Sequence, residues 1–305
     1  MFQVPPSVEA KIFARLPDKF RNPKKRSRWI EIRRRGVDTH SFFEGPSFDR
    51  DGNLYVVDLA YSRIFRISPN RTFTLIADYD GEPNGLKIHR DGRIFVADHR
   101  LGLLQLDPDT GSLNPILERA FLESFKGLND LIFDKDGTLY FTDQGETGMN
   151  DPTGRVYRRF PDGRLQLLLN NVPSPNGIAL SPDETLLYVA ATRGNCIWRV
   201  PIETTGEVSR AGIFIQLSGG LAGPDGIAVD AKGGLIACIN GFGTVWAFSR
   251  LGEPQLRIHS PEGLATTNCA FGGPDNKTLF ITESSSGSIL AVDMEVPGLP
   301  LFSHA

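Results

Sequence analysis

Short runs in which hydrophobic and polar residues alternate recur along the chain, and tight turns separate them. An alternation with a period of two predicts β-strands that bury one face. In the clearest copy, the runs Ile178–Leu180 and Leu186–Ala191 flank a turn that contains Pro182 and Asp183. Most other copies carry an Asp-Gly turn at this place, which is the strongest short-range signal for a β-hairpin. No segment has sustained helical periodicity, so the pattern predicts an all-β protein.

The same strand-turn-strand unit occurs six times, and an oxygen-bearing residue precedes or opens each copy. These six landmark residues are Glu44, Asn84, Asn129, Asn176, Asp225 and Asn268. Their numbers differ by 40, 45, 47, 49 and 43. That period is typical of one four-stranded propeller blade. The chain is therefore predicted to be a six-bladed β-propeller.

The last repeat has only three good strands, because Pro297 and Pro300 argue against a fourth. A propeller must close its ring, and an open sheet edge invites aggregation. The segment Glu9–Leu16 alternates well enough to be a strand. We expect it to become the outer strand of the last blade. A single propeller domain over 1–305 follows, with 1–40 as closing strand and basic segment and 41–295 as blades.

The composition is that of an ordinary globular protein, with 40% hydrophobic and 23% charged residues and a formal net charge of −3. No apolar run approaches the length of about 18 residues that spans a bilayer. The N-terminus lacks the apolar core of a secretory signal. The three cysteines (Cys196, Cys238 and Cys269) lie in or beside apolar runs and are predicted to be buried free thiols. We expect a cytoplasmic protein that does not bind a membrane.

A basic run lies between Arg21 and Arg35, with Glu31 as its sole acidic residue. Its members are Arg21, Lys24, Lys25, Arg26, Arg28, Arg33, Arg34 and Arg35. Such a run is typical of a patch for nucleic acid or another anionic partner. The favoured interpretation is a solvated loop that Trp29 helps to dock on the rim of the propeller or on another subunit. Because the rest of the chain is acidic, we expect self-association and do not expect nucleic-acid binding.

The six landmark residues share one place in a propeller, because the start of each first strand lies nearest the central axis. They should form a ring of two carboxylates and four amides around the mouth of the channel. Hard oxygen donors of this kind favour Ca²⁺, followed by Mg²⁺ or Mn²⁺, with Zn²⁺ less suited. The alternative interpretation is that Asn and Asp merely cap turns, as they often do.

These residues resemble the signature of the gluconolactonase, regucalcin and senescence-marker-protein family. The matching segments are Glu44-Gly45-Pro46, Asn129-Asp130, Asn176-Gly177 and Asp225-Gly226. Bacterial drug-responsive lactonases are similar at Leu128-Asn129-Asp130 and Phe141-Thr142-Asp143. The resemblance implies a six-bladed propeller that hydrolyses lactones with a divalent metal, usually Ca²⁺. By the same resemblance, Glu44, Asn129, Asn176 and Asp225 would hold that metal. Paraoxonases and diisopropylfluorophosphatase use a similar ring.

The sequence departs from this family at one position. In members that hydrolyse sugar lactones, an Arg that grips the sugar precedes the metal-binding Asn by two residues. Here that position is Gly127, and the side chain of its neighbour Lys126 should point elsewhere. The departure favours a lactone or related ester that is less polar than a sugar lactone. Paraoxonases place a His where this chain has Asn84, so the sequence does not support a His-based mechanism there.

Metal-assisted hydrolysis also needs a base that delivers water to the carbonyl. Asp225 is the first candidate for this catalytic role and Asp143 the second. Substrate contacts are expected from Asn84, His99, Asn268, Arg193 and Glu146. The last of these lies in a long loop, Gln144–Pro152, that would form a pocket wall or bind a second ion through Asp130 or Asp143.

The sequence therefore predicts a metal-dependent lactonase that acts on a small lactone or ester. Two alternatives remain open, since a propeller fold alone licenses no chemistry. One is a non-catalytic propeller that binds a metal and a metabolite. The other is a different ester or phosphotriester hydrolase that uses the same metal. A serine hydrolase is not expected, because Ser174 and Ser181 have no His at motif spacing.

Overall fold

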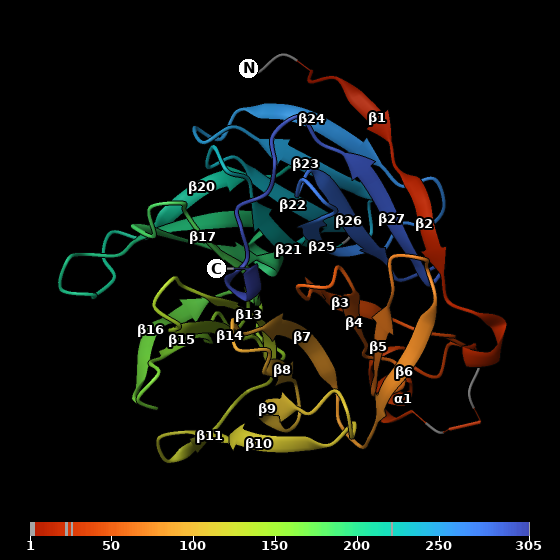
Figure 1. The fold of residues 1–305 in the computed structure, drawn as a ribbon. Coiled ribbons are helices and arrows are strands. Elements are labelled where there is room, and N and C mark those ends of the chain that lie inside the picture. The colour runs from red at the N-terminus through yellow and green to blue at the C-terminus, as the bar shows by residue number, and fades with distance from the viewer. Residues whose placement is uncertain (1–3, 22–23, 26, 221, 305) are drawn as a thin grey trace.

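The fold is built from six antiparallel sheets arranged around a central axis, as Figure 1 shows in a computed structural model. The structure describes residues 4–21, 24–25, 27–220 and 222–304 of the chain. The strands of each sheet follow one another in the sequence from the axis outward, except that N-terminal strands are added on the outside of the last two sheets. This arrangement is the predicted six-bladed β-propeller, and the alternating pattern of the sequence is its cause.

The first three blades span residues 43–172. Blade one comprises β3 (Phe43–Phe48), β4 (Leu54–Asp58), β5 (Arg63–Ile67) and β6 (Phe73–Asp78). Blade two comprises β7 (Pro83–Ile88), β8 (Ile94–Asp98), β9 (Gly102–Leu106) and β10 (Leu113–Leu117). Blade three comprises β13 (Leu128–Phe133), β14 (Leu139–Asp143), β15 (Gly154–Arg159) and β16 (Leu165–Val172). A small hairpin of β11 (Arg119–Ala120) and β12 (Glu123–Ser124) precedes blade three.

The other three blades complete the ring. Blade four comprises β17 (Pro175–Leu180), β18 (Leu186–Ala191), β19 (Cys196–Pro201) and β20 (Gly212–Gln216). Blade five comprises β21 (Gly223–Val229), β22 (Leu235–Asn240), β23 (Thr244–Phe248) and β24 (Pro254–His259). Blade six comprises β25 (Thr266–Gly272), β26 (Thr278–Glu283) and β27 (Ser288–Asp293), and it takes its outer strand from the N-terminus.

The N-terminal segment closes the ring as predicted. Strand β2 (Lys11–Arg15) pairs antiparallel with β27 and so completes blade six. The sequence did not predict a second contact, in which β1 (Ser7–Glu9) pairs parallel with β24 of blade five. In Figure 1, the red N-terminal strands lie against the blue C-terminal ones. The two ends of the chain are thus joined by backbone hydrogen bonds that leave no open edge there.

Helical structure is confined to short pieces within the described residues. They are η1 (Asp18–Phe20), α1 (Arg28–Arg33), η2 (Thr192–Gly194) and η3 (Phe302–His304). At six residues, α1 is too short for hydrophobic periodicity to reveal it. None of these helices is long and apolar enough to cross a membrane.

The hydrophobic core lies between neighbouring blades. Between blades one and six, for example, Phe43 and Phe65 are packed in one buried cluster with Phe280 and Ile289. All three cysteines are free and buried, as predicted. On the channel end where the C-terminal segment runs, η3 packs Phe302 against the ring of His89, with 4.8 Å between ring centroids.

Each innermost strand is irregular at its landmark residue. The register of pairing with the second strand shifts in all six blades, at Glu44/Ser47, Pro83/Gly85, Leu128/Leu131, Pro175/Ile178, Pro224/Ile227 and Thr266/Asn268. A β-bulge redirects the side chains next to it. Glycine after the landmark allows close approach of the next blade, since a Cβ on Gly177 would lie 2.4 Å from the carbonyl oxygen of Asp225. The repeat therefore crowds six landmarks into one narrow ring.

Candidate functional site

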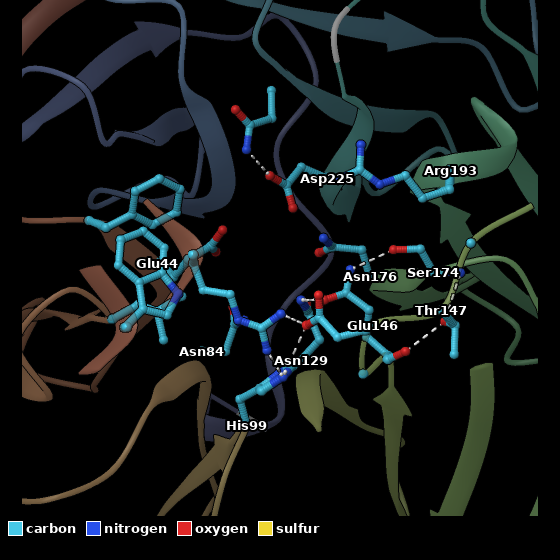
Figure 2. A pocket seen from close by; sticks show the side chains of 18 of the residues that line it. Glu44, Asn84, His99, Asn129, Glu146, Thr147, Ser174, Asn176, Arg193 and Asp225 are labelled. Carbon is cyan, nitrogen blue, oxygen red and sulfur yellow. Dashed lines mark hydrogen bonds and ion pairs between the residues drawn. The ribbon is translucent and has the colours of Figure 1, made fainter. Parts of the chain in front are cut away.

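A pocket of about 610 Å³ opens where the innermost strands begin. It gathers side chains from the landmark residues, from the ends of second strands and from the loop after β14. The predicted site residues that line it are Glu44, Asn84, His99, Asn129, Glu146, Asn176, Arg193 and Asp225. Figure 2 shows these side chains around one common space. The roles predicted for them remain predictions, but their convergence is a feature of the fold.

Asn268 is the landmark residue that does not line this pocket. Its amide lies behind Glu44, and its Nδ2 donates to Glu44 Oε2 at 3.1 Å. The same Nδ2 lies 3.4 Å from Asp130 Oδ2. Asn268 is 2% exposed and is not among the residues that line the pocket. In this position it orients the Glu44 carboxylate, and a contact between Asn268 and substrate stays a prediction.

The two carboxylates of the ring are held in a strongly desolvated place. Glu44 and Asp225 are each 4% exposed. Burial, together with the charges of Asp225 and Asp130, raises the pKa of Glu44 well above its usual value. Burial also raises the pKa of Asp225 to about 7, although hydrogen bonds from Asn240 and Asn176 oppose the shift. Without a compensating cation, the protein therefore resists ionising both groups.

The amide of Asn176 adds the clearest sign of a missing partner. Its side chain hydrogen bonds to Asp225, while its own Oδ1 is buried without any hydrogen-bond partner. Buried oxygen atoms are rarely left unpaired in native structures. An unpaired amide oxygen beside two buried carboxylates is a donor set that fits a hard cation such as Ca²⁺.

Asn129 is the fourth member of the implied ligand set. Its Nδ2 donates to Gln144 Oε1 at 2.9 Å, which fixes the orientation of the amide. Within the described residues, no group of three or more His, Cys, Asp or Glu is placed to hold a metal ion. A cation here would rely on two carboxylates and two amides, as the sequence suggested.

Asp143 is the predicted catalytic residue that the structure places away from the pocket. It does not line the pocket, is fully buried and forms an ion pair with Arg155, whose Nε lies 2.7 Å from Oδ2. Its Oδ1 accepts a hydrogen bond from Gly127 N at 2.8 Å. A carboxylate occupied on both oxygens is less available to collect a proton from water in the pocket. These contacts favour a structural role for Asp143, and its role as a base stays a prediction.

The same arrangement recurs in other blades. A carboxylate at the end of the second strand accepts from the backbone just before or at the start of the first strand of its own blade. The pairs are Phe42 N with Asp58 Oδ1, Glu82 N with Asp98 Oδ2, and Ala265 N with Glu283 Oε1. This device ties the two inner strands together. It also occupies Asp143, while Asp130 Oδ1 lies 3.9 Å from Lys87 Nζ, and a second ion at either carboxylate stays a prediction.

His99 and Gly127 explain the departure from the family pattern. A Cβ on Gly127 would lie 2.4 Å from His99 Cε1, and the φ of Gly127 is +149°. An arginine at this position would require the imidazole ring of His99 to move. Lys126 points away as expected, with its Nζ 2.8 Å from Thr153 Oγ1.

The proton on His99 can be placed from its partners. Arg33 lies 3.0 Å from His99 Nε2, and arginine has no acceptor, so this nitrogen must accept. The ring proton is then on Nδ1, which leaves it for the hydrogen bond to the backbone of Leu128. Burial, with help from the charge of Arg33, lowers the pKa of His99 to about 4. His99 is therefore neutral, and its basic nitrogen is already engaged.

Sequence reasoning missed part of the pocket wall. Trp29 and Arg33 line the pocket from α1, and Asn240 lines it from the end of β22. Asn240 Nδ2 donates to Asp225 Oδ2 at 2.8 Å. The basic run that contains α1 was noticed, and docking on the rim was one interpretation of Trp29. Nothing in the sequence indicated which side chain of that run would reach the pocket.

The basic run docks on the propeller itself. Lys25 Nζ lies 2.5 Å from Asp78 Oδ1, and Arg28 lies 2.7 Å from the buried Glu82 carboxylate. The ring of Trp29 packs on Phe42, with 4.9 Å between centroids. Arg26, another member of the run, lies outside the described residues. These contacts hold α1 at the edge of the pocket.

A sequence profile described as the SMP-30/gluconolactonase/LRE-like region matches residues 42–285. Among curated proteins, the lactonase drp35 of Staphylococcus aureus strain USA300 is 33% identical over 289 residues, covering 86% of this chain and 84% of the relative. The gluconolactonase of Zymomonas mobilis is 32% identical over 275 residues, covering 79% and 76%.

Solved structures show the same likeness. A gluconolactonase from Xanthomonas campestris superposes with a TM-score of 0.73 at 25% identity, covering 97% of this chain and 99% of that one. Regucalcin from Agrobacterium tumefaciens, described as a calcium-binding protein, has a TM-score of 0.73 at 25% identity and covers 87% and 94%.

Proposed function

The chain belongs to the SMP-30/gluconolactonase/LRE-like family, and from this premise we propose that it hydrolyses lactones with the help of a bound divalent cation. The observation that carries the proposal is the convergence of Glu44, Asn176 and Asp225 in one pocket, with Asn176 Oδ1 buried and unpartnered. The names of the relatives, lactonase and gluconolactonase, support the same reaction class.

Glu44, Asn129, Asn176 and Asp225 would hold the cation, with Ca²⁺ as the first candidate because all donors are oxygens. When bound, such an ion polarises the lactone carbonyl and stabilises the negative charge that develops on it. The protein prepares this place by orienting the donors. Asn268 holds Glu44, Asn240 holds Asp225, and Gln144 holds Asn129.

Asp225 is the proposed base that takes a proton from the attacking water. Burial raises the pKa of Asp225 to about 7 in the cation-free protein, and a bound cation would favour the ionised form, which is the form that accepts a proton. Asn240 donates to Oδ2 and so fixes the plane of the carboxylate. His99 is not available for this task, because Arg33 occupies its Nε2.

In family members that hydrolyse sugar lactones, an arginine binds the sugar hydroxyls. The substrate of this chain is not bound in that way. That arginine is absent here, because position 127 is glycine and the ring of His99 fills the space beside it. Two other arginines, Arg33 and Arg193, line the pocket instead.

A panel of aliphatic, aromatic and sugar lactones tests the proposal. After treatment with a chelator, the protein should be inactive, and Ca²⁺, Mg²⁺, Mn²⁺ or Zn²⁺ should restore hydrolysis measured by acid release. Glu44→Gln and Asp225→Asn should abolish turnover while the circular dichroism of the sheets is kept. Asp109→Asn, at an exposed turn on the chain's surface, is the matched control and should leave rates unchanged.

A lack of lactone hydrolysis would favour one of the two alternative functions. A protein that binds the cation but hydrolyses no lactone would be either a binding propeller or a hydrolase of another ester class. Adding aryl esters and phosphotriesters to the same panel distinguishes those two.

A further inference from the structure

Two arginines reach the pocket from distant parts of the chain. Arg33 comes from α1, and Arg193 comes from η2 at the end of β18. In Figure 2, the side chain of Arg193 extends toward Asp225. Both arginines contact the loop after β14, where Arg33 forms an ion pair with Glu146 and Arg193 packs beside Gly148. The part of the pocket wall that α1 and η2 form therefore carries two positive charges.

Arg33 already holds a carboxylate, although a weakly bound one. Its side chain is 28% exposed, whereas that of its partner Glu146 is 73% exposed. An ion pair with so well solvated a partner contributes little to stability. The Nη2 atom of the guanidinium lies 3.0 Å from His99 Nε2, whereas Nη1 pairs with Glu146. Arg33 is thus positioned for a carboxylate, and Glu146 is easily replaced by another one.

Arg193 has no such occupant. Within the described part of the chain, no carboxylate lies within salt-bridge distance of its guanidinium, and the side chain is exposed on the pocket wall. The carboxylates nearest the axis, Glu44 and Asp225, belong to the proposed cation site. The charge that remains for a substituent on the substrate is therefore that of Arg193 and Arg33.

We infer that the pocket is specific for lactones that carry a free carboxylate, which Arg33 and Arg193 bind while the ring carbonyl faces Glu44 and Asp225. The inference rests on the proposed function. Arginine binds a carboxylate through two parallel hydrogen bonds, and a neutral substituent cannot reproduce them. On binding, the substrate carboxylate displaces Glu146 from Arg33. The basic N-terminal run thus supplies a specificity-determining residue.

Matched substrates test the inference. We compare a γ-butyrolactone that bears a carboxylate on the carbon next to the ring oxygen with the corresponding primary amide. The two have the same ring and nearly the same size, so the difference is the charge. Wild-type kcat/KM should favour the acid by about tenfold or more, as expected for hydrogen bonds to a charged group. The preference should appear mainly in KM.

Three substitutions locate the preference. Arg33→Gln and Arg193→Gln should each lower the acid-to-amide ratio of kcat/KM by about tenfold. Arg34→Gln, an exposed arginine on the same helix end that does not line the pocket, should leave the ratio unchanged. Glu146→Gln should lower KM for the acid, because it removes the competing carboxylate.

Calorimetry with a ligand that cannot be hydrolysed separates this inference from the proposed function. The ligand is the cyclopentanone carboxylate in which a methylene replaces the ring oxygen, compared with its amide. Tighter binding of the acid, lost in Arg33→Gln and Arg193→Gln, supports the carboxylate subsite even if no lactone is hydrolysed. Hydrolysis of lactones without a preference for the acid, and equal binding of the two ketones, would overturn the inference and leave the lactonase proposal standing.

Discussion

At the scale of single residues, Asp225 combines features that seldom occur together. It is buried, it accepts from Asn240 at 2.8 Å, and it lies beside an asparagine whose Oδ1 has no partner. Burial penalises the charged form of the carboxylate, and an incoming cation reverses that penalty. The protonation state of Asp225 should therefore be coupled to cation binding.

The first prediction concerns this coupling. The pKa of Asp225 is raised to about 7 in the folded, cation-free protein and lies near its ordinary value of 3.8 when unfolded. Between these values the folded state binds the extra proton, so stability of the cation-free protein should fall as pH rises through this window. A cation needs the ionised carboxylate, so the rise in Tm produced by Ca²⁺ should shrink as pH falls below about 7.

Scanning calorimetry with Ca²⁺ or with chelator, at about pH 5.5 and about pH 8, measures both trends. A Ca²⁺ effect that is equal at the two pH values would contradict the coupling. In Asp225→Asn the pH dependence of the cation-free protein should become weaker.

The second prediction contrasts Asp143 with Asp225. Asp143→Asn removes the buried charged partner of Arg155 and leaves it only the exposed Glu123, so the variant should lose about 3 kcal/mol of stability. Its kcat/KM per folded molecule should stay within a few-fold of wild type. Asp225→Asn should show the reverse, with a folded protein and no turnover. Urea unfolding and lactone hydrolysis on the same samples provide the comparison, and inactivity of well-folded Asp143→Asn would favour it as a catalytic candidate.

At the scale of elements, α1 is an addition to the propeller, and the fold class does not predict its role. Ser27 caps it by accepting from Ile30 N at 3.1 Å, and Arg28 ties it to Glu82 of blade two. Trp29 packs it on Phe42 of blade one. The basic residues of this segment thus dock on carboxylates at the rim of the propeller. A short helix held by side chains in this way is a wall of the pocket that can change without disturbing the blades.

The third prediction tests this docking. Trp29→Ala removes an aromatic pair that contributes about 1 kcal/mol, so α1 should open about fivefold more often. Trypsin should then cut the Arg- and Lys-rich segment faster, and KM for lactones should rise. Ile32→Ala is the control, because Ile32 is 56% exposed on the same helix and does not line the pocket. Equal cleavage of the two variants would show that Trp29 does not hold the segment.

At the scale of the whole molecule, stability depends on joining the first strands to the last blades. Strand β2 completes blade six, and Leu16, which is 2% exposed, packs into the core between blades six and one. Strand β1 adds only three exposed residues to blade five. The ring is therefore closed mainly by β2. Self-association, which the uneven distribution of charge suggested, remains a prediction at this scale.

The fourth prediction compares two truncations. Removal of residues 1–9 takes away β1 alone, and Tm should fall by a few degrees. Removal of residues 1–16 also deletes β2 and the buried Leu16, whose side chain alone stabilises the fold by about 2 kcal/mol. The longer truncation should unfold at much lower temperature and aggregate, because β27 then presents an open edge. Calorimetry and light scattering measure the difference, and similar behaviour of the two proteins would argue against closure by β2.

The sequence by itself determined the repeat. Alternation and turn chemistry are local properties, so the six copies, the position of the landmark residues and the need for a closing strand could be predicted without coordinates. The convergence of Glu44, Asn129, Asn176 and Asp225 also followed, since equivalent positions of a cyclic repeat must meet at its axis.

Only the tertiary structure decided what each side chain meets. Asp143 has the same neighbours in sequence whether it faces water or Arg155, and Asn268 resembles the other landmark residues until its contact with Glu44 is seen. Arg33 is one of eight basic residues in its run, and the docking of α1 selects it for the pocket. The physical reason is that pairing partners come from segments far apart in the chain, and no local pattern encodes the distance between them.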